Sequence, residues 1–331
     1  MPDDNTPLLS VSGLTVSFRT ERGTASAING VDFTLKRGEV LCLLGESGSG
    51  KSVTLRALMR LLPERRSRIG GTVLLNGEDV YTLPERRMER LRGKAISMVF
   101  QEPMLALDPV YTIGHQIAET IVRHEGVSFA DAERRALDLL ERVQIPSAKR
   151  RLKAYPHEMS GGMRQRAMIA LALSCNPALL LADEPTTALD ATVQMQILLL
   201  LRQLQAELNM AVIMVTHDMG VAAETADRIA VMYAGRFVEL GTARQVLKTP
   251  QHPYTAGLMS STVHGNMRGH ALEAIPGAPP DLTALPPGCA YAPRCAYAEA
   301  ACTAAPPPET WLEPGRMARC VRACAAVPAA V

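Results

Sequence analysis

The sequence predicts an α/β protein with a largely parallel sheet, an antiparallel β subdomain, an inserted helical subdomain and a small cysteine-rich C-terminal extension. Three observations predict this class. The apolar run 40–44 leads through a glycine-rich loop into a helix-like segment. The apolar runs 178–182 and 211–215 are typical of buried strands in a parallel sheet. Between 102 and 166 the pattern changes, and 132–143 has helical spacing.

Composition limits the class of protein. The chain has 331 residues, of which 47% are hydrophobic and 21% are charged, so it can bury a sizeable core. Its formal net charge of +2 is too small to indicate binding to nucleic acid or to an anionic membrane surface. The N-terminus is acidic and polar, unlike a secretory signal, and the apolar stretches are far shorter than a membrane span. We therefore expect a cytosolic protein that reaches a membrane only by docking on a protein that spans it.

Alternating apolar and polar residues predict the antiparallel β subdomain. The segments 14–18 and 31–35 alternate with the period of a half-buried strand. Further along the chain, 229–233 and 236–240 form a predicted hairpin. Phe18 lies upstream of the glycine-rich loop, where it is either a core residue or an aromatic side chain that stacks on a purine.

The most specific motif is an eight-residue stretch of the form G-x-x-x-x-G-K-S. Its glycines let backbone N–H groups turn inward around an anion, and the helix that follows adds its positive dipole end. Lys51 would reach the β- and γ-phosphates of a nucleotide, and the Ser52 hydroxyl would ligate Mg²⁺. An ordinary strand–helix turn is the alternative. The predicted nucleotide-binding residues of this motif are Gly45, Ser47, Gly48, Ser49, Gly50, Lys51, Ser52 and Val53.

Polar residues stand at the ends of three further predicted strands. These residues are Gln101, the adjacent pair Asp183 and Glu184, and His217. Two carboxylates at a strand end are costly to bury without cations, so one would hold Mg²⁺ and the other could orient a water for attack on phosphorus. A solvated strand end and a structural histidine are the alternatives. Because the carboxyl ends of parallel strands meet at one edge of the sheet, we expect these residues to share a site.

A Ser-Gly-Gly sequence is a second candidate anion site. Ser160, Gly161 and Gly162 precede a helical run, so a side-chain cap and exposed amides would meet at a helix start. The residues alone do not distinguish phosphate contact from an ordinary glycine-rich helix start. Asp190 is predicted to cap a later helix whose apolar residues follow one face.

In order and spacing, these motifs resemble those of ABC-transporter ATPase subunits, over about residues 8–250. The resemblance rests on six motifs: the glycine-rich loop, Gln101, the Ser-Gly-Gly segment, the Asp183–Glu184 pair, the turn at 187–190, and His217. The run 252–255 (His-Pro-Tyr-Thr) and the spacing C-x₅-C-x₆-C from Cys289 look like the C-terminal extension of the dipeptide/oligopeptide/nickel importer branch.

The resemblance implies a P-loop NTPase core and a binding role for several residues. The loop amides and Lys51 would hold the phosphates of ATP. Ser52, Gln101 and Asp183 would share Mg²⁺. Lys51 and Gln101 would also assist catalysis, since they would contact the reacting phosphate and its metal ion.

The resemblance also implies the catalytic residues and a second chain. Glu184 would be the catalytic base, and His217 would contact the γ-phosphate. Phe18 would stack on adenine. The Ser-Gly-Gly segment, Ser160, Gly161 and Gly162, would bind ATP held by another subunit. Met163 stands where many members of the family have Gln. Met is common at this position in this branch, so it does not indicate an inactive site.

Five of the seven cysteines lie near the C-terminus. Because some members of this branch are thought to hold an iron–sulfur cluster there, the resemblance implies a 4Fe–4S cluster on Cys289, Cys295, Cys302 and Cys320, with Cys324 as a rival fourth ligand. The spacing lacks the close cysteine pairs of zinc sites, which argues against Zn²⁺ without excluding it. Unligated thiols are the remaining alternative.

The leading hypothesis is therefore an ATPase subunit that energises import of peptides or a related small solute. We expect three kinds of partner: a second, related ATPase subunit, two transmembrane permease subunits and an extracytoplasmic solute-binding protein. The expected location is the cytoplasmic face of the inner membrane. Residues 1–250 would form the ATPase domain, with a helical subdomain at about 102–166, and 251–331 the C-terminal extension.

Two alternatives concern the substrate and the partner. The importer could carry nickel, other metal chelates or opines, because solute specificity lies in other subunits. A soluble ABC ATPase that acts on nucleic acid is the remote alternative, since such proteins usually have two ATPase units or long coiled-coil insertions. A further hypothesis makes the cysteine-rich extension a redox or iron sensor that regulates transport.

Overall fold

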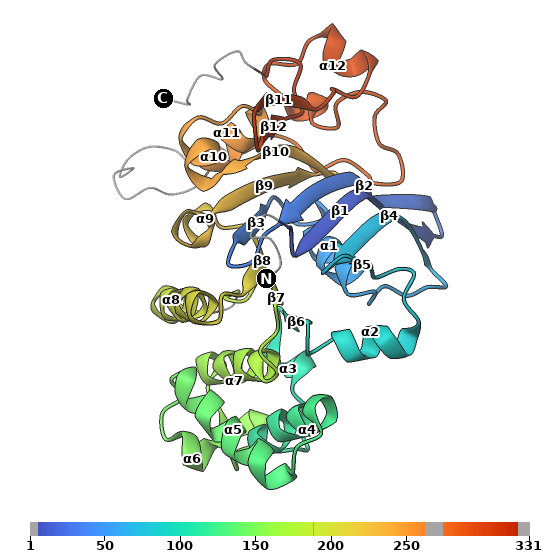
Figure 1. Cartoon of the computed structure of the whole chain (residues 1–331). Coiled ribbons are helices and arrows are strands. Elements are labelled where there is room, and N and C mark those ends of the chain that lie inside the picture. Colours follow the sequence, from blue (N-terminus) through green and yellow to red (C-terminus); the bar gives the residue numbers. More distant parts are fainter. Residues whose placement is uncertain (1–5, 188, 262–273, 324–331) are drawn as a thin grey trace. The chain divides into compact units, whose positions relative to one another are not determined.

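The structure is a computed structural model that describes residues 6–187, 189–261 and 274–323, and its chain divides into two compact units. The first unit comprises Met1–Leu8, Leu35–Glu39 and Asn76–Met214. The second comprises Leu9–Thr34, Val40–Leu75 and Val215–Val331. Figure 1 shows the elements coloured along the sequence.

The first unit contains most of the helices. Its helical elements are α2 (Glu85–Leu91), α3 (Pro103–Ala106), α4 (Ile113–Glu125), α5 (Phe129–Arg142), α6 (Ala148–Arg151), the 3₁₀ turn η1 (Pro156–Glu158), α7 (Gly161–Leu173) and α8 (Ala191–Leu208). Its strands are β5 (Glu78–Asp79), β6 (Ile96–Val99), β7 (Leu179–Asp183) and most of β8 (Ala211–Thr216).

Helix α5 shows why the middle of the chain is helical. Ser128 caps it, because its hydroxyl accepts a hydrogen bond from the backbone N–H of Asp131 at 3.1 Å. Ala132, Ala136 and Leu140 lie four residues apart on one face and are fully buried. The structure thus confirms the helix predicted from spacing, and helices α4 to α7 cluster together in Figure 1.

The strands β6 and β7 of the first unit are parallel neighbours. Their register pairs Ile96 with Leu179 and Val99 with Ala182. Every residue of both strands is buried, as expected for the interior of an α/β sheet. Because the strands run in parallel, the residues that follow them emerge at the same edge.

The second unit contains two groups of strands. One has the order β2 (Gly23–Leu35), β1 (Leu9–Thr20) and β4 (Ser67–Leu75). The other has the order β11 (Thr310–Glu313), β12 (Arg316–Ala318), β10 (Arg236–Thr242), β9 (Arg228–Tyr233) and β3 (Val40–Leu44). Its helical elements are α1 (Lys51–Leu58), α9 (Met219–Thr225), α10 (Ala243–Lys248), α11 (Pro253–Ser260), the 3₁₀ turn η2 (Ala292–Arg294) and α12 (Ala300–Ala304).

The pairing within these groups follows the sequence patterns. β1 and β4 are antiparallel, from Leu9 opposite Leu75 to Phe18 opposite Ser67, which gives the expected antiparallel β structure. β3 lies parallel to β9, and β9 and β10 form the predicted hairpin.

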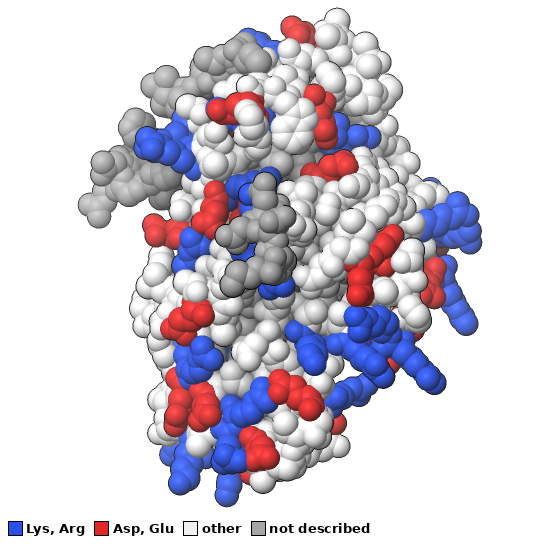
Figure 2. All heavy atoms as spheres, in the orientation of Figure 1, with Lys and Arg blue, Asp and Glu red and all other residues white. Residues whose placement is uncertain are grey.

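The visible surface carries both signs of charge. Figure 2 shows lysine and arginine side chains interspersed with aspartate and glutamate, in agreement with the net charge of +2. None of the helices in the described ranges is both long and apolar enough to cross a membrane.

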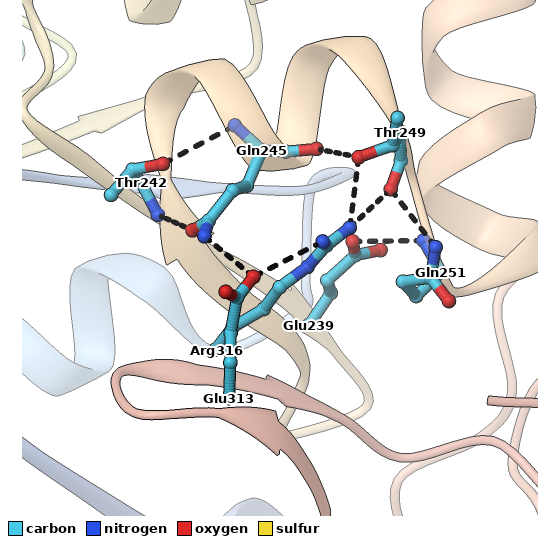
Figure 3. A network of polar contacts seen from close by, with 7 residues as sticks. All are labelled: Glu239, Thr242, Gln245, Thr249, Gln251, Glu313 and Arg316. Carbon is cyan, nitrogen blue, oxygen red and sulfur yellow. Dashed lines mark hydrogen bonds and ion pairs between the residues drawn. The ribbon is translucent and has the colours of Figure 1, made fainter. Parts of the chain in front are cut away.

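The C-terminal region is more regular than its prolines suggest. Proline-rich stretches such as 306–308 are typical of irregular segments, but β11 and β12 form a hairpin that extends the sheet beside β10. Figure 3 shows the polar network that attaches this hairpin to α10. Glu313 accepts a hydrogen bond from Gln245 Nε2 at 2.8 Å, and Arg316 Nη2 donates to the carbonyl of Thr249 at 2.6 Å. These contacts join residues too far apart in the sequence for local patterns to reveal.

Candidate functional site

The glycine-rich loop after β3 needs glycine at both of its ends. Gly45 has φ +154°, and a Cβ there would lie 2.3 Å from the carbonyl oxygen of Met232. Gly50 has φ +110°, and its Cβ would lie 2.6 Å from the carbonyl oxygen of Ala27. Neither backbone atom can move away cheaply, so a side chain at either position would displace the loop.

Lys51 is the first residue of α1, and its ammonium group lies inside the loop. The side chain is only 5% exposed, and Nζ donates hydrogen bonds to the carbonyl oxygens of Gly45 at 2.7 Å and Glu46 at 2.8 Å. Ser52 and Val53 follow on the first turn of the helix, which has no acidic residue to oppose an anion. The lysine, the helix dipole and the loop amides together suit a bound phosphate.

Two side chains from far along the chain hold the same loop. The hydroxyl of Tyr254 accepts a hydrogen bond from the backbone N–H of Glu46 at 2.8 Å. The guanidinium of Arg294 pairs with both carboxylate oxygens of Glu46, at 2.6 and 2.9 Å. No pattern in the sequence indicates that Tyr254 or Arg294 lies beside the loop. The only available signal was the run 252–255, which contains Tyr254 and was noted as a family motif.

In the first unit, the residues after β6 and β7 come together as predicted. Gln101 Nε2 donates a hydrogen bond to Glu184 Oε2 at 3.3 Å, and Thr187 Oγ1 donates to the same oxygen at 2.8 Å. Asp183, the last residue of β7, is only 2% exposed. The two adjacent carboxylates therefore differ in environment, because Glu184 is partly exposed and Asp183 is not.

The backbone of Glu184 is left-handed, with φ +45°. This conformation is uncommon for residues other than glycine, and such strain gathers at functional sites. The turn that follows is closed by a backbone hydrogen bond from Thr187 N to Glu184 O at 3.2 Å. Ala188, within the same turn, lies outside the described residues.

The Ser-Gly-Gly segment forms a capped and exposed helix start, also in the first unit. The Ser160 hydroxyl accepts a hydrogen bond from Met163 N at 3.3 Å, which caps α7. Ser160 and Gly161 are exposed. A Cβ at Gly162 would approach Val193 Cγ1 to 2.9 Å, so glycine allows the close packing of α7 on α8.

The two remaining predicted residues belong to the second unit. His217 follows β8 and is exposed, and the next residue, Asp218, caps α9 by accepting a hydrogen bond from Gly220 N at 2.7 Å. Phe18 lies on β1, opposite Ser67, and is half-buried. Stacking of Phe18 on adenine therefore stays a prediction.

Two protein-family models match this chain. The model described as ABC transporter matches residues 28–187, which include the glycine-rich loop and Glu184. The model described as oligopeptide/dipeptide transporter, C-terminal region, matches residues 238–302.

Curated relatives match nearly the whole chain. A Brucella abortus (strain 2308) protein, named provisionally as a peptide import ATP-binding protein, is 51% identical over 95% of this chain and 94% of its own length. The oligopeptide transport ATP-binding protein OppD of Salmonella typhimurium is 49% identical over 97% of this chain and 95% of its own length.

The prediction of an iron–sulfur cluster is wrong. The names of these relatives give no iron–sulfur role, and within the described ranges no group of three or more His, Cys, Asp or Glu residues is placed to hold a metal ion. Cys289, Cys295, Cys302 and Cys320 nevertheless line one small cavity, of about 20 Å³.

Burial raises the pKa of the Cys289, Cys295 and Cys320 thiols. Cys324, the rival fourth ligand, lies outside the described residues.

Solved structures agree with the assignment of the cassette. A dimeric structure of the ATP-binding cassette MJ0796 in a post-hydrolysis state with ADP and Pi has a TM-score of 0.64 and 28% identity, and covers 71% of this chain and 99% of that chain. The structure of cbiO1 from Clostridium perfringens, part of the ABC transporter complex cbiONQ, has a TM-score of 0.62 and 27% identity, and covers 72% of this chain and 90% of that chain. These likenesses confirm the predicted ABC ATPase fold. The chain therefore belongs to the ATP-binding proteins of ABC transporters, in the branch that carries the oligopeptide/dipeptide transporter C-terminal region.

Proposed function

We propose that this ABC-type ATPase binds and hydrolyses ATP to energise import of peptides. The observation that carries the proposal is the 49% identity to OppD of Salmonella typhimurium over 97% of this chain, which includes the C-terminal region. That protein is named for oligopeptide transport, and the matched C-terminal family model is named for oligopeptide and dipeptide transport.

The glycine-rich loop would hold the phosphates of ATP. Backbone amides of the loop would donate to the phosphates, and Lys51 would exchange its carbonyl partners in Gly45 and Glu46 for phosphate oxygens. Phe18 would stack on the adenine. The absence of acidic residues in the first turn of α1 supports this assignment, because a negative charge there would repel the nucleotide.

The donor set suits Mg²⁺, which prefers oxygen ligands. Ser52, Gln101 and Asp183 would supply a hydroxyl, an amide and a carboxylate oxygen. Asp183 supports the fit, since its carboxylate lies at the end of β7 and is only 2% exposed, where a bound cation would balance its charge. Bound Mg²⁺ would neutralise charge that develops on the phosphates.

Glu184 would act as the general base, and His217 would contact the γ-phosphate. Gln101 and Thr187 donate to Glu184 and would orient its carboxylate toward the attacking water. Gln101 would thus serve both the metal ion and the base.

A complete site would need two chains. Ser160, Gly161 and Gly162 would bind ATP held by a second ATPase subunit, and the exposure of Ser160 and Gly161 leaves them accessible for this contact. The dimeric structure of MJ0796 with ADP and Pi supports such an arrangement. The second subunit would be a related chain rather than a copy.

The other partners follow from the importer assignment. Two permease subunits would span the membrane, and an extracytoplasmic protein would bind the solute. The ATPase would lie at the cytoplasmic face of the inner membrane. Within the chain, residues 1–250 would form the ATPase domain, 102–166 its helical subdomain, and 251–331 the extension.

The experiment is reconstitution of this chain with its companion ATPase, permeases and binding protein in proteoliposomes. Addition of a dipeptide or a longer peptide should stimulate ATP hydrolysis and drive uptake of the labelled peptide. Lys51→Ala should abolish both, because it removes the ammonium that holds the phosphates. Hydrolysis that no peptide stimulates would contradict the substrate class, and full activity of Lys51→Ala would contradict the site.

A further inference from the structure

The phosphate loop contains one acidic residue, Glu46. A carboxylate in this loop would oppose the binding of a nucleotide, because it adds negative charge beside the phosphates. In the structure this charge is paired. Arg294 Nη1 lies 2.6 Å from Glu46 Oε2, and Nη2 donates to Oε1 at 2.9 Å. One guanidinium therefore takes both oxygens of the carboxylate in the two-pronged geometry that makes such pairs strong and directional.

Arg294 is itself held in a defined position by the second unit. The residue is 7% exposed, and Nε donates to the carbonyl of Pro276 at 2.8 Å. Nη1 also donates to the hydroxyl of Tyr233 at 3.3 Å, and the guanidinium carbon lies 6.0 Å from the centre of the Tyr291 ring. A side chain fixed at this many points acts as a rigid support for Glu46.

A second contact fixes the backbone of the same loop residue. Glu46 N donates to the hydroxyl of Tyr254 at 2.8 Å, and the carbonyl of Glu46 accepts from Lys51 Nζ at 2.8 Å. Glu46 is therefore held through both its side chain and its main chain, and its carbonyl, together with that of Gly45, holds the ammonium of Lys51. Both supports, Tyr254 and Arg294, come from the region beyond residue 250.

On this geometry we propose that Arg294 is a positioning residue of the nucleotide site: it cancels the charge of Glu46 and holds the phosphate loop in the conformation that binds Mg·ATP. The C-terminal region thereby becomes part of the nucleotide site of this ATPase. The inference rests on the proposed function only in taking the glycine-rich loop as the phosphate-binding element.

The first test is Arg294→Gln in the full-length chain, with binding of Mg·ATP and Mg·ADP measured by isothermal titration calorimetry. We expect affinity for both nucleotides to fall roughly tenfold, as for one uncompensated charge near the phosphates. Because the loss is electrostatic, it should shrink as salt rises from low to high ionic strength. Arg294→Lys keeps the charge without the two-pronged contact, so its nucleotide affinity should lie between those of the wild type and Arg294→Gln.

The double variant Glu46→Gln/Arg294→Gln separates this role from a merely structural one. It removes both charges, so we expect nucleotide affinity to return to within about threefold of the wild type. If Arg294 only supports the fold, the double variant should bind as weakly as Arg294→Gln. Thermal unfolding of each variant shows whether it is folded at the binding temperature, and the double variant, which leaves no unpaired charge buried, keeps the comparison available if Arg294→Gln does not fold.

Arg319→Gln is the matched control. Arg319 forms an ion pair with Glu309 within the same C-terminal region, and neither residue contacts the loop in any hydrogen bond or ion pair that the described residues show. This variant should lose some stability and keep wild-type nucleotide affinity. An equal loss of affinity in Arg319→Gln would overturn the proposal, because any destabilisation of the C-terminal region would then be enough to weaken nucleotide binding.

Lys51→Ala distinguishes failure of the inference from failure of the proposed site. If Lys51→Ala loses nucleotide binding while Arg294→Gln keeps wild-type affinity at low salt, only the role of Arg294 is overturned. If Lys51→Ala binds Mg·ATP normally, the glycine-rich loop is not the phosphate site and both conclusions fall.

Discussion

Two turns that follow buried strands are held in different ways. The loop after β3 depends on distant residues, since Tyr254 and Arg294 both contact Glu46. The turn after β7 depends on one near residue and one strand neighbour: Thr187, three residues along, and Gln101, which follows the adjacent strand, both donate to Glu184. The first is a support built by tertiary structure, and the second is built by local geometry and one strand pairing.

The difference in support suggests a division of labour. A loop that must close round a charged ligand benefits from anchors that hold it open before binding, because preorganisation lowers the cost of association. A base that must turn toward water needs only its own orienting donors. Changes to the anchors of the first turn should therefore alter nucleotide affinity and stability, whereas changes to the second should alter turnover.

The largest effect should come from Glu184→Gln. The amide has nearly the same shape and can still accept from Thr187, but it cannot take a proton from water. We expect ATP hydrolysis to fall by about 10²–10⁴-fold while Mg·ATP still binds. Single-turnover phosphate release and equilibrium binding measure the two quantities. Unchanged turnover would remove Glu184 from its role and break the comparison.

The next effect compares two glycines of the same loop. In Gly45→Ala the new Cβ would lie 2.3 Å from a backbone oxygen, so we expect a loss of about 2–4 kcal/mol in the free energy of unfolding. Gly48 has φ +78° and open space around its Cα, so Gly48→Ala should cost only about 1 kcal/mol of backbone strain. Urea unfolding measures both variants. Equal losses of stability in the two variants would show that the carbonyl of Met232 does not restrict position 45 to glycine.

Thr187→Val tests the turn after β7. Valine keeps the shape of threonine and removes the hydroxyl that donates to Glu184 at 2.8 Å. We expect kcat for ATP hydrolysis to fall about 3–10-fold, with nucleotide affinity unchanged, because one orienting hydrogen bond is lost. Steady-state kinetics over a range of ATP concentrations separates the effect on kcat from the effect on nucleotide affinity. A change in affinity alone would place Thr187 with the nucleotide rather than with the base.

The smallest effect concerns acid sensitivity of the loop support. His252 caps α11, the helix that carries Tyr254, and its Nδ1 accepts from Tyr254 N at 3.0 Å. Burial lowers the pKa of His252 from 6.5 to about 3. The unfolded chain therefore takes up the proton first, so the stability due to neutral His252 is present above pH 6.5 and is lost as pH falls toward 3.

His252→Asn tests this pH dependence. Asparagine keeps a capping acceptor and does not titrate in this range, so the midpoint of thermal unfolding should fall less steeply between pH 6.5 and 4 than in the wild type. The variant should be somewhat less stable at pH 7, since it leaves part of a buried volume empty. Parallel curves for the two proteins would assign the acid sensitivity to another group.

Local patterns in the sequence were enough for the fold and for the candidate residues. Strand–loop–helix order, alternation and the Ser128 cap are decided by residues close in the chain, and the structure confirms the elements that they predict. A shared edge for the residues that follow the buried strands was also expected, whereas the parallel pairing of β6 with β7 is a finding of the structure. The assignment of nucleotide roles to individual residues stays a prediction.

Cysteine spacing was a poor guide for a physical reason. Four thiols at family-like intervals can line one cavity, as they do here, yet spacing contains no information on the geometry of their sulfur atoms. That geometry depends on how the surrounding residues pack, and within the described residues it forms no group that could hold a metal ion.

The sequence by itself determined the local geometry that a phosphate loop requires: glycines where the backbone needs positive φ, and a lysine at the start of a helix. Only the tertiary structure decided what holds that loop in place. Arg294 lies 248 positions from Glu46, and no periodicity or propensity acts over such a distance. The pair forms because packing of the C-terminal region buries a guanidinium, and a buried charge must find its partner wherever the fold brings one.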